Sequence, residues 1–279
     1  MQLQLTTAIT AATLLVTSAQ AATVAYDGFD TTEYTAGADI NGVNGGSNWE
    51  TGWAGSANYD AQATGLTYLD LETTDGASGR IASGGFGAVT RDFAESDQSG
   101  VIYFSYLLDA NGTNNNDRIS FSDDTVERFR IGLTNGGQVN LQVQLAGGDN
   151  TNYTVDTSTG GLLGSTTLIV GQIEITGDVE DANTVWINPT DLSDVAGTAA
   201  DTLTATVQDV RDAQTTDTGL FAPVRGFDIR ATNQVQTYDE IRVSFGPDAD
   251  LTDVVPVPEP TAMIGASVGG LMVMSRRRR

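Results

Sequence analysis

The sequence predicts an all-β protein whose fold is an antiparallel β-sandwich. Many short segments alternate apolar and polar residues, as strands with one wet face do. The connections between them are rich in Gly and Asn, which tolerate positive φ angles in turns. No stretch of ten or more residues shows a convincing helical period. At 279 residues with 39% hydrophobic content, the chain can bury a sizeable core, and we expect a single domain at 22–246.

The clearest strands are predicted in the middle and at the end of this domain. Residues 139–145 and 241–245 alternate between apolar and polar side chains. Residues 101–108 (VIYFSYLL) are apolar on both faces except at Ser105, which predicts a central strand covered on each side. A hairpin is predicted where an Asn-Gly-Gly turn joins 126–133 to 139–145. Further strands are predicted at 66–72, 86–93, 118–122, 167–175, 184–188 and 226–231.

Two segments lack such patterns, and we expect them to be connections without regular secondary structure. Residues 191–218 are the least patterned part of the domain, and we expect a long loop over one end or edge of the sandwich. Residues 247–256 are short and acidic, and we expect a linker.

The first 21 residues are predicted to be a secretory signal peptide. An apolar centre at 8–16 precedes Ala19-Gln20-Ala21, a small-x-small cleavage site, so cleavage is expected after Ala21. The segment has no Lys or Arg, and a buried first helix is the alternative. An exported mature protein is the expected product.

The last residues, 257–279 (VPEPTAMIGASVGGLMVMSRRRR), have three parts in order. Pro258-Glu259-Pro260 is stiff and extended. An apolar helix follows that is shorter than the roughly 20 residues of a stable membrane span. Four arginines then close the chain, and such a cationic end stays on the cytoplasmic side of a membrane. A chance membrane tail is the alternative to a processing signal.

This arrangement resembles the PEP-CTERM sorting signal of Gram-negative bacteria. The resemblance implies transient anchoring in the inner membrane and an exosortase partner that cleaves near Pro258, Glu259 and Pro260. It also implies that the mature protein is located at the cell surface or in the extracellular matrix.

Charge and composition exclude several functions. Residues 22–257 contain nine arginines against 35 aspartate and glutamate residues, a formal charge of −26, and the chain has no lysine. Such a surface repels phosphate backbones, so nucleic-acid binding is excluded. The acidity fits solubility in a salty medium or low-specificity binding of divalent cations. Without Cys or His, Ser-His-Asp catalysis, Cys-His catalysis and His-based zinc sites are excluded as well.

Several short motifs, in order, carry a second resemblance. They are 26–30 (YDGFD), 41–46 (NGVNGG) with Trp49 and Trp53, 185–189 (VWINP) and 238–243 (YDEIRV). Together they are similar to exported, PEP-CTERM-tagged proteins with a concanavalin-A-like (laminin-G-like) jelly roll. The resemblance implies this fold for nearly the whole mature chain.

The pattern of carboxylates argues against catalysis. Retaining glycosidases use two carboxylates about 5–5.5 Å apart, and laminarinase-like enzymes carry them as E-x-D-x-x-E on one strand. No such triplet is present: Gly177 interrupts the cluster of Glu174, Asp178 and Glu180, and Asp239 and Glu240 are expected on opposite faces. We therefore expect a non-enzymatic protein. A polysaccharide-active glycoside hydrolase on the same fold is the alternative.

The jelly-roll resemblance also implies a structural calcium site where the first and last strands lie side by side. Asp27 or Asp30 in the opening segment and Asp239 in the closing one fall at matching positions. Calcium prefers six to eight oxygen ligands. The alternative is that these carboxylates are ordinary surface charges.

A third hypothesis is glycan binding. Trp49, Trp53 and Tyr59 cluster near a loop rich in Gly and Asn, where an exposed ring could stack on a sugar of an extracellular polysaccharide. The alternative is that these rings pack under the loop. The expected role is structural or glycan-associating.

Overall fold

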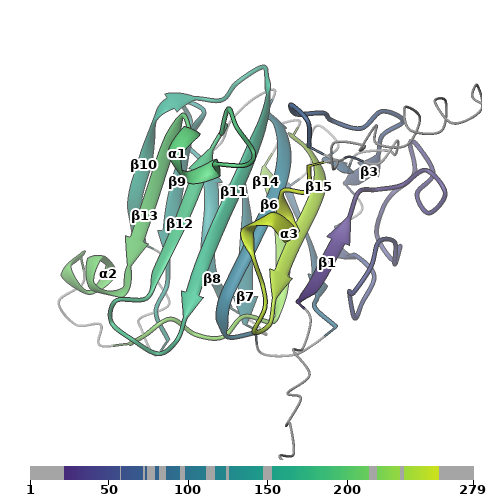
Figure 1. The fold of residues 1–279 in the computed structure, drawn as a ribbon. Coiled ribbons are helices and arrows are strands. Elements are labelled where there is room, and N and C mark those ends of the chain that lie inside the picture. Colours follow the sequence, from purple (N-terminus) through teal and green to yellow (C-terminus); the bar gives the residue numbers. More distant parts are fainter. Residues whose placement is uncertain are drawn as a thin grey trace, which may run out of the picture.

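The computed structural model describes residues 22–56, 58–71, 73, 79–81, 86–94, 98–110, 117–123, 126–146, 153–213, 219–232 and 236–257. In this part of the chain, two antiparallel sheets are stacked face to face, and the helices are short (Figure 1). The predicted antiparallel β-sandwich is therefore confirmed.

The eight-stranded sheet, here called sheet I, is built around the last strand. β15 (Gln236–Phe245) pairs with β6 (Gly100–Ala110) along one side, while β1 (Thr23–Asp27) and β4 (Gly79–Ile81) share the other side. The first and last strands are thus neighbours, as the jelly-roll resemblance implied, and Thr23 lies opposite Phe245. In order across the sheet the strands are β13 (Asp201–Thr206), β12 (Ala182–Ile187), β11 (Thr166–Ile175), β6 (Gly100–Ala110), β15 (Gln236–Phe245), β4 (Gly79–Ile81) and β3 (Tyr59–Ala61), with β1 (Thr23–Asp27) beside β15.

The seven-stranded sheet, here called sheet II, supplies the other half of the core. Phe121, Phe129 and Phe227 lie side by side on its inner face. The Phe121 ring is 4.9 Å from that of Phe104 in sheet I, measured between centroids. The order is β10 (Tyr153–Gly161), β9 (Gln138–Val143), β8 (Val126–Leu133), β7 (Arg118–Asp123), β14 (Gly226–Thr232), β5 (Phe86–Asp92) and β2 (Ala54–Gly55).

The outer face of sheet I carries a second, smaller apolar cluster. Leu107 of β6 and Trp186 of β12 are buried there beneath segments that include α1 (Val195–Thr198) and α3 (Leu251–Val254). Ser105 also points to this face, where its hydroxyl donates a hydrogen bond to the Val254 carbonyl. β6 is therefore covered on both faces, which confirms the expectation for residues 101–108.

Two predicted segments differ from expectation. Described residues 66–71 contain no strand, and Leu66 N–H bonds to the Asp239 carboxylate. The predicted loop 191–218 contains α1, β13 and α2 (Val207–Ala213). β10 was also missed by the sequence patterns.

The predicted linker, 247–256, folds back onto the sandwich. Asp250 caps α3 with a reciprocal capping box that also uses Asp253. Val254 and Val255 are 0% and 2% exposed, packed on the outer face of sheet I. The folded unit therefore extends through Val255, beyond the expected end at 246.

Candidate functional site

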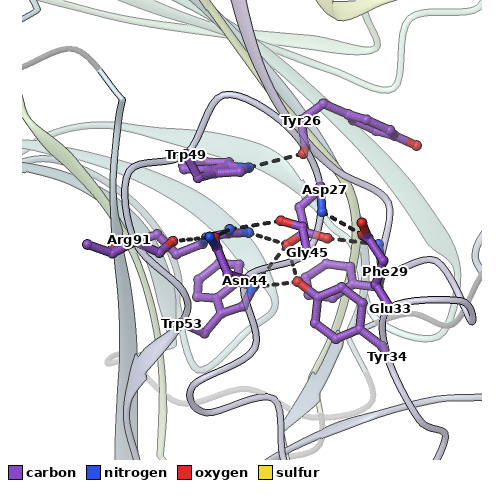
Figure 2. Close-up of polar contacts among 12 residues, drawn as sticks. Tyr26, Asp27, Phe29, Glu33, Tyr34, Asn44, Gly45, Trp49, Trp53 and Arg91 are labelled. Carbon is purple, nitrogen blue, oxygen red and sulfur yellow. Dashed lines mark hydrogen bonds and ion pairs between the residues drawn. The ribbon is translucent and has the colours of Figure 1, made fainter.

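Asp27, one of the predicted calcium ligands, lies at the centre of a buried polar cluster (Figure 2). Its carboxylate accepts four hydrogen bonds, from Phe29 N–H, Tyr34 hydroxyl, Trp53 Nε1 and Arg91 Nη1. Arg91 lies on β5 of sheet II, at 2.5 Å from Asp27 Oδ2. Its guanidinium group therefore neutralises the Asp27 charge.

Arg91 also organises the loop that follows β1. Its Nη2 donates to Asn44 Oδ1 at 2.9 Å and to the Gly45 carbonyl at 2.8 Å. The guanidinium carbon lies 4.7 Å from the Trp49 ring centroid and 5.2 Å from that of Trp53. Figure 2 shows the loop wrapped around this single cation. Arg91 and Asp27 are fully buried, so the cluster stabilises the fold at the start of this loop.

The three aromatic residues proposed for glycan binding are buried. The exposed fractions are 0% for Trp53, 1% for Tyr59 and 8% for Trp49. Trp49 Nε1 donates to the Tyr26 carbonyl, and the Tyr59 hydroxyl donates to the carbonyls of Gly87 and Ile229. Rings enclosed in this way cannot stack on a sugar in this conformation, so the structure supports the packing alternative.

Asp239 is buried at an irregularity of β15. The register shifts between Asp239 and Arg242, and the intervening Glu240 has a φ of +51°. Asp239 accepts hydrogen bonds from Leu66 N–H at 2.6 Å and from Glu240 N–H at 2.9 Å. Burial raises the pKa of Asp239 to about 8, despite the opposing hydrogen bond from Leu66. Asp239 is therefore a buried carboxyl group held mostly in its protonated form at neutral pH.

The calcium site stays a prediction. Asp30, the third expected ligand, is half-buried and caps its own turn by accepting from Thr32 N–H. Among the residues that the structure describes, no group of three or more acidic side chains is arranged to hold a metal ion. A thermal melt with calcium and with chelator at fixed ionic strength, repeated on Asp239→Ala, tests the site.

The predicted processing residues Ala21, Pro258, Glu259 and Pro260 lie outside the described residues. Within the described ranges, none of the helices has the length and apolar character needed to cross a membrane.

The outer face of sheet II has a different character from that of sheet I. One row of cross-strand neighbours on it consists of Thr90, Asp228, Ser120, Arg130 and Gln142. The described helices lie elsewhere: α1 and α3 cover sheet I, and α2 contacts β10 and β13. This outer polar face is the candidate functional surface.

Glu127 is the centre of an arginine cluster on the outer polar face. Arg118 binds its carboxylate through Nε at 2.9 Å and Nη2 at 2.7 Å, and Arg130 Nε lies 2.5 Å away. Arg230 Nη2 lies at 3.8 Å. Burial favours a higher pKa for Glu127, but the hydrogen bonds and charge of Arg118, with Arg130 and Arg230, lower the pKa overall. Glu127 is thus held as a carboxylate.

A β-bulge brings Glu127 to this face. Strict alternation from Phe129 would place Glu127 on the inner, apolar face. The register between β7 and β8 instead shifts between Phe121 and Ser122, so that Ser122 lies opposite Glu127. Because a one-residue slip reverses the face of a side chain, the alternation pattern alone could not identify this residue.

Asp228 is a second carboxyl group on the outer polar face. It is 8% exposed and accepts a hydrogen bond from the Ser122 hydroxyl at 2.6 Å. Burial raises the pKa of Asp228 to about 6, the Ser122 hydrogen bond opposes the rise, and the charge of Glu127 adds to it. Two neighbouring carboxyl groups therefore have pKa values shifted in opposite directions.

Comparison with known proteins gives no sequence relative and only distant structural likenesses. No family model matches the chain, and no curated protein matches its sequence. Among solved structures, it is similar to an endo-β-1,4-glucuronan lyase from the fungus Trichoderma reesei, with 12% identity, a TM-score of 0.46 and coverage of 77% of this chain and 96% of that chain. It is also similar to the calcium-bound exoplasmic/lumenal domain of VIP36, with 11% identity, a TM-score of 0.40 and coverage of 72% and 88%. An alginate lyase from Chlorella virus, vAL-1, has 10% identity, a TM-score of 0.38 and coverage of 63% and 88%.

Proposed function

We propose that this chain is an exported protein of the cell surface or extracellular matrix that associates with polysaccharide and does not cleave it. The proposal includes a concanavalin-A-like jelly roll, a cleaved signal peptide and an exosortase-processed C-terminus. The observation that carries it is the contrast between the two outer faces of the sandwich. An apolar cluster covers part of the outer face of sheet I, whereas the outer face of sheet II presents polar side chains.

The outer polar face offers the chemistry that sugars need. Gln142, Arg130 and Arg230 are partly exposed and supply hydrogen-bond donors, while the amide of Gln142 also supplies an acceptor. These side chains project from β9, β8 and β14 of one hydrogen-bonded sheet, which limits the conformational entropy lost on binding. An extended polysaccharide chain could lie across the strands and form hydrogen bonds with these side chains in place of water.

A matched pair of glutamine variants tests the surface. Gln142 is on the outer polar face, and Gln172 lies on the opposite outer face, where it bonds to Glu174. In affinity electrophoresis of the full chain through gels containing neutral or acidic polysaccharides, we expect retardation. Gln142→Ala should weaken it about 2- to 10-fold, the effect of one hydrogen bond. Gln172→Ala should leave it unchanged. No retardation by any polysaccharide would refute the proposed function.

A second candidate function is glycoside hydrolysis, and Asp228 is the observation that favours it. The pKa of Asp228 is raised to about 6, whereas that of the neighbouring Glu127 is lowered. A catalytic acid and its partner carboxylate differ in pKa in the same way. Glu127, however, is engaged by arginine side chains. We expect no release of reducing ends from β-glucan, agar or carrageenan. Turnover that Asp228→Asn abolishes would establish the hydrolase instead.

A further inference from the structure

We propose that a pocket beside sheet I binds the free amino group of an amino-sugar polysaccharide. The pocket lies between two loops, 66–71 and 188–193, and the end of the described chain at Val257, and its volume is about 330 Å³. Ligand pockets typically have volumes of roughly 300–1,000 Å³. The inference rests on the proposed function, since it takes a polysaccharide as the ligand, and it adds a second site apart from the outer polar face.

The two loops are held in place by the fold. The Tyr68 hydroxyl donates to the Pro189 carbonyl at 3.0 Å and so joins one loop to the other. Asn188 bonds to Leu168 of β11 in both directions: its Oδ1 accepts from Leu168 N–H at 3.1 Å, and its N–H donates to the Leu168 carbonyl at 2.9 Å. Leu192 packs into the apolar cluster on the outer face of sheet I. The pocket is therefore preformed, which limits the entropy lost when a ligand binds.

The pocket presents aliphatic side chains to solvent. Leu69 is 59% exposed and Val257 is 42% exposed, and both line the pocket. A ligand that covers them removes apolar surface from water, which favours binding. The C–H bonds on one face of a sugar ring are the apolar part of its surface, and they can pack against such side chains.

The polar lining of the pocket is acidic and rich in hydrogen-bond acceptors. Asp70 and Asp191 supply exposed carboxyl groups, and Thr190 and Ser193 supply hydroxyls. Hydrogen bonds from the hydroxyl and the backbone N–H of Ser193 hold the pKa of Asp191 below its usual range. None of the described residues that line the pocket is basic. Because carboxylates accept hydrogen bonds and donate none, the ligand must supply donors, and a protonated amino group supplies three with the complementary charge.

The charge of the whole domain acts in the same direction. The formal charge of −26 on residues 22–257 attracts cationic ligands at long range and repels anionic ones. Both this attraction and the local ion pair are screened by salt, so affinity should fall as the salt concentration rises.

The shape of the pocket favours an amino sugar over a basic peptide. Peptides commonly bind by adding a strand to a sheet edge or by laying a helix in a long groove, whereas this pocket is compact and lies between loops. A hexosamine with a free amino group carries the cation, neighbouring hydroxyls and an apolar C–H face within one ring. These three features match the carboxyl groups, the hydroxyls and the aliphatic side chains of the pocket.

Isothermal titration of the purified full chain with a β-1,4-linked glucosamine trisaccharide tests the site. The probe is compared with its N-acetylated form, which keeps the rings and removes the charge, with a neutral β-glucan trisaccharide and with a lysine tripeptide. Asp70→Asn is the informative variant, because Asp70 is exposed, whereas Asp191 also holds the turn at Ser193. Glu180→Gln is the matched control: it removes the same charge from an exposed position before β12, at the other end of that strand from the pocket.

We expect the glucosamine trisaccharide to bind more tightly than the other three probes. Asp70→Asn should weaken its binding about 10-fold, the loss of one charge-assisted hydrogen bond, while Glu180→Gln should match the wild type. Thermal melts of both variants check the fold. Equal effects of the two variants would assign the binding to general acidity and overturn the pocket.

The other probes separate the remaining outcomes. Equal binding of the amino and N-acetylated forms would overturn the role of the amino group, and equal or tighter binding of the lysine tripeptide would identify a basic peptide as the ligand instead. Binding of neutral saccharides alone would overturn the amino-sugar site while preserving the proposed function. Binding of no saccharide, together with no retardation by any polysaccharide, would refute both.

Discussion

Asp27 and Arg91 form a fully buried ion pair that joins the two sheets of the sandwich, with 2.5 Å between Oδ2 and Nη1. Asp27 is the last residue of β1 in sheet I, and Arg91 lies on β5 in sheet II. The remaining Arg91 donors bind the loop after β1. One interaction therefore couples the sheets to each other and to the N-terminal loop.

Removing one member of the pair should destabilise the fold strongly. Arg91→Leu leaves the Asp27 carboxylate buried without a counter-charge, and we expect the free energy of unfolding to fall by about 3–5 kcal/mol. Urea denaturation followed by tryptophan fluorescence measures this, because Trp49 and Trp53 flank the pair. The double variant Asp27→Asn/Arg91→Leu should recover part of the loss. A loss below about 1 kcal/mol in Arg91→Leu would show that the pair is dispensable.

Gly171 should tolerate no side chain. A methyl group added there would lie 2.1 Å from Cζ of Phe104, a fully buried ring on the neighbouring β6. We expect Gly171→Ala to lower the free energy of unfolding by about 1–3 kcal/mol through overpacking. Gly160→Ala is the control, since no atom lies within 4 Å of the added methyl. Equal denaturation midpoints for the two variants would contradict this packing.

Stability should decrease as the pH rises from about 4 to 8. In the folded protein the pKa of Asp239 is raised to about 8, mainly by burial, against about 3.9 in the unfolded chain. The folded state therefore holds a proton that the unfolded state has released, so the stabilisation is complete below pH 4 and is lost as pH approaches 8. Asp228, with a pKa raised by burial to about 6, contributes in the same direction.

Melting temperatures measured across this pH range at constant ionic strength test the effect. Asp239→Asn cannot ionise and should flatten the upper part of the curve, between about pH 6 and 8. An unchanged slope in Asp239→Asn would assign the pH dependence to other groups.

If the C-terminus is a sorting signal, the protein recovered outside the cell should lack residues 276–279 and the apolar run before them. Intact-mass measurement of the secreted fraction decides this. Glu259→Ala should leave the precursor in the inner membrane. Recovery of the complete C-terminus outside the cell would exclude processing.

The parts of the fold that could be predicted are those in which local pattern and final environment agree. β6 was recognisable because its apolar side chains occupy both faces, and β8 because it precedes an Asn-Gly-Gly turn. β13 was missed because only Leu203 and Ala205 mark its buried side. In the predicted linker, two adjacent valines, Val254 and Val255, were too weak a signal to indicate packing onto sheet I.

The candidate site could not be predicted from the sequence, because it depends on long-range strand pairing that no local pattern encodes. Glu127 reaches the outer polar face through a bulge, and its partner Arg230 comes from a strand about a hundred residues later. Arg91 did leave a signal, since it occupies an inward position between Val89 and Phe93. A charged residue at an apolar position predicts a buried partner, although the identity of Asp27 required the fold.

The pairing of β1 with β15 has a mechanical consequence. Thr23, at the start of β1, lies opposite Phe245, at the end of β15. The chain beyond Phe245 then folds back as α3 and packs on the outer face of sheet I. A force that pulls the two ends of the fold apart must therefore detach α3 before it can load the ladder between β1 and β15. Once α3 is detached, the ladder would open one hydrogen-bonded pair at a time, starting at Thr23 and Phe245. The packing of α3 should thus set the force at which the fold begins to open under tension.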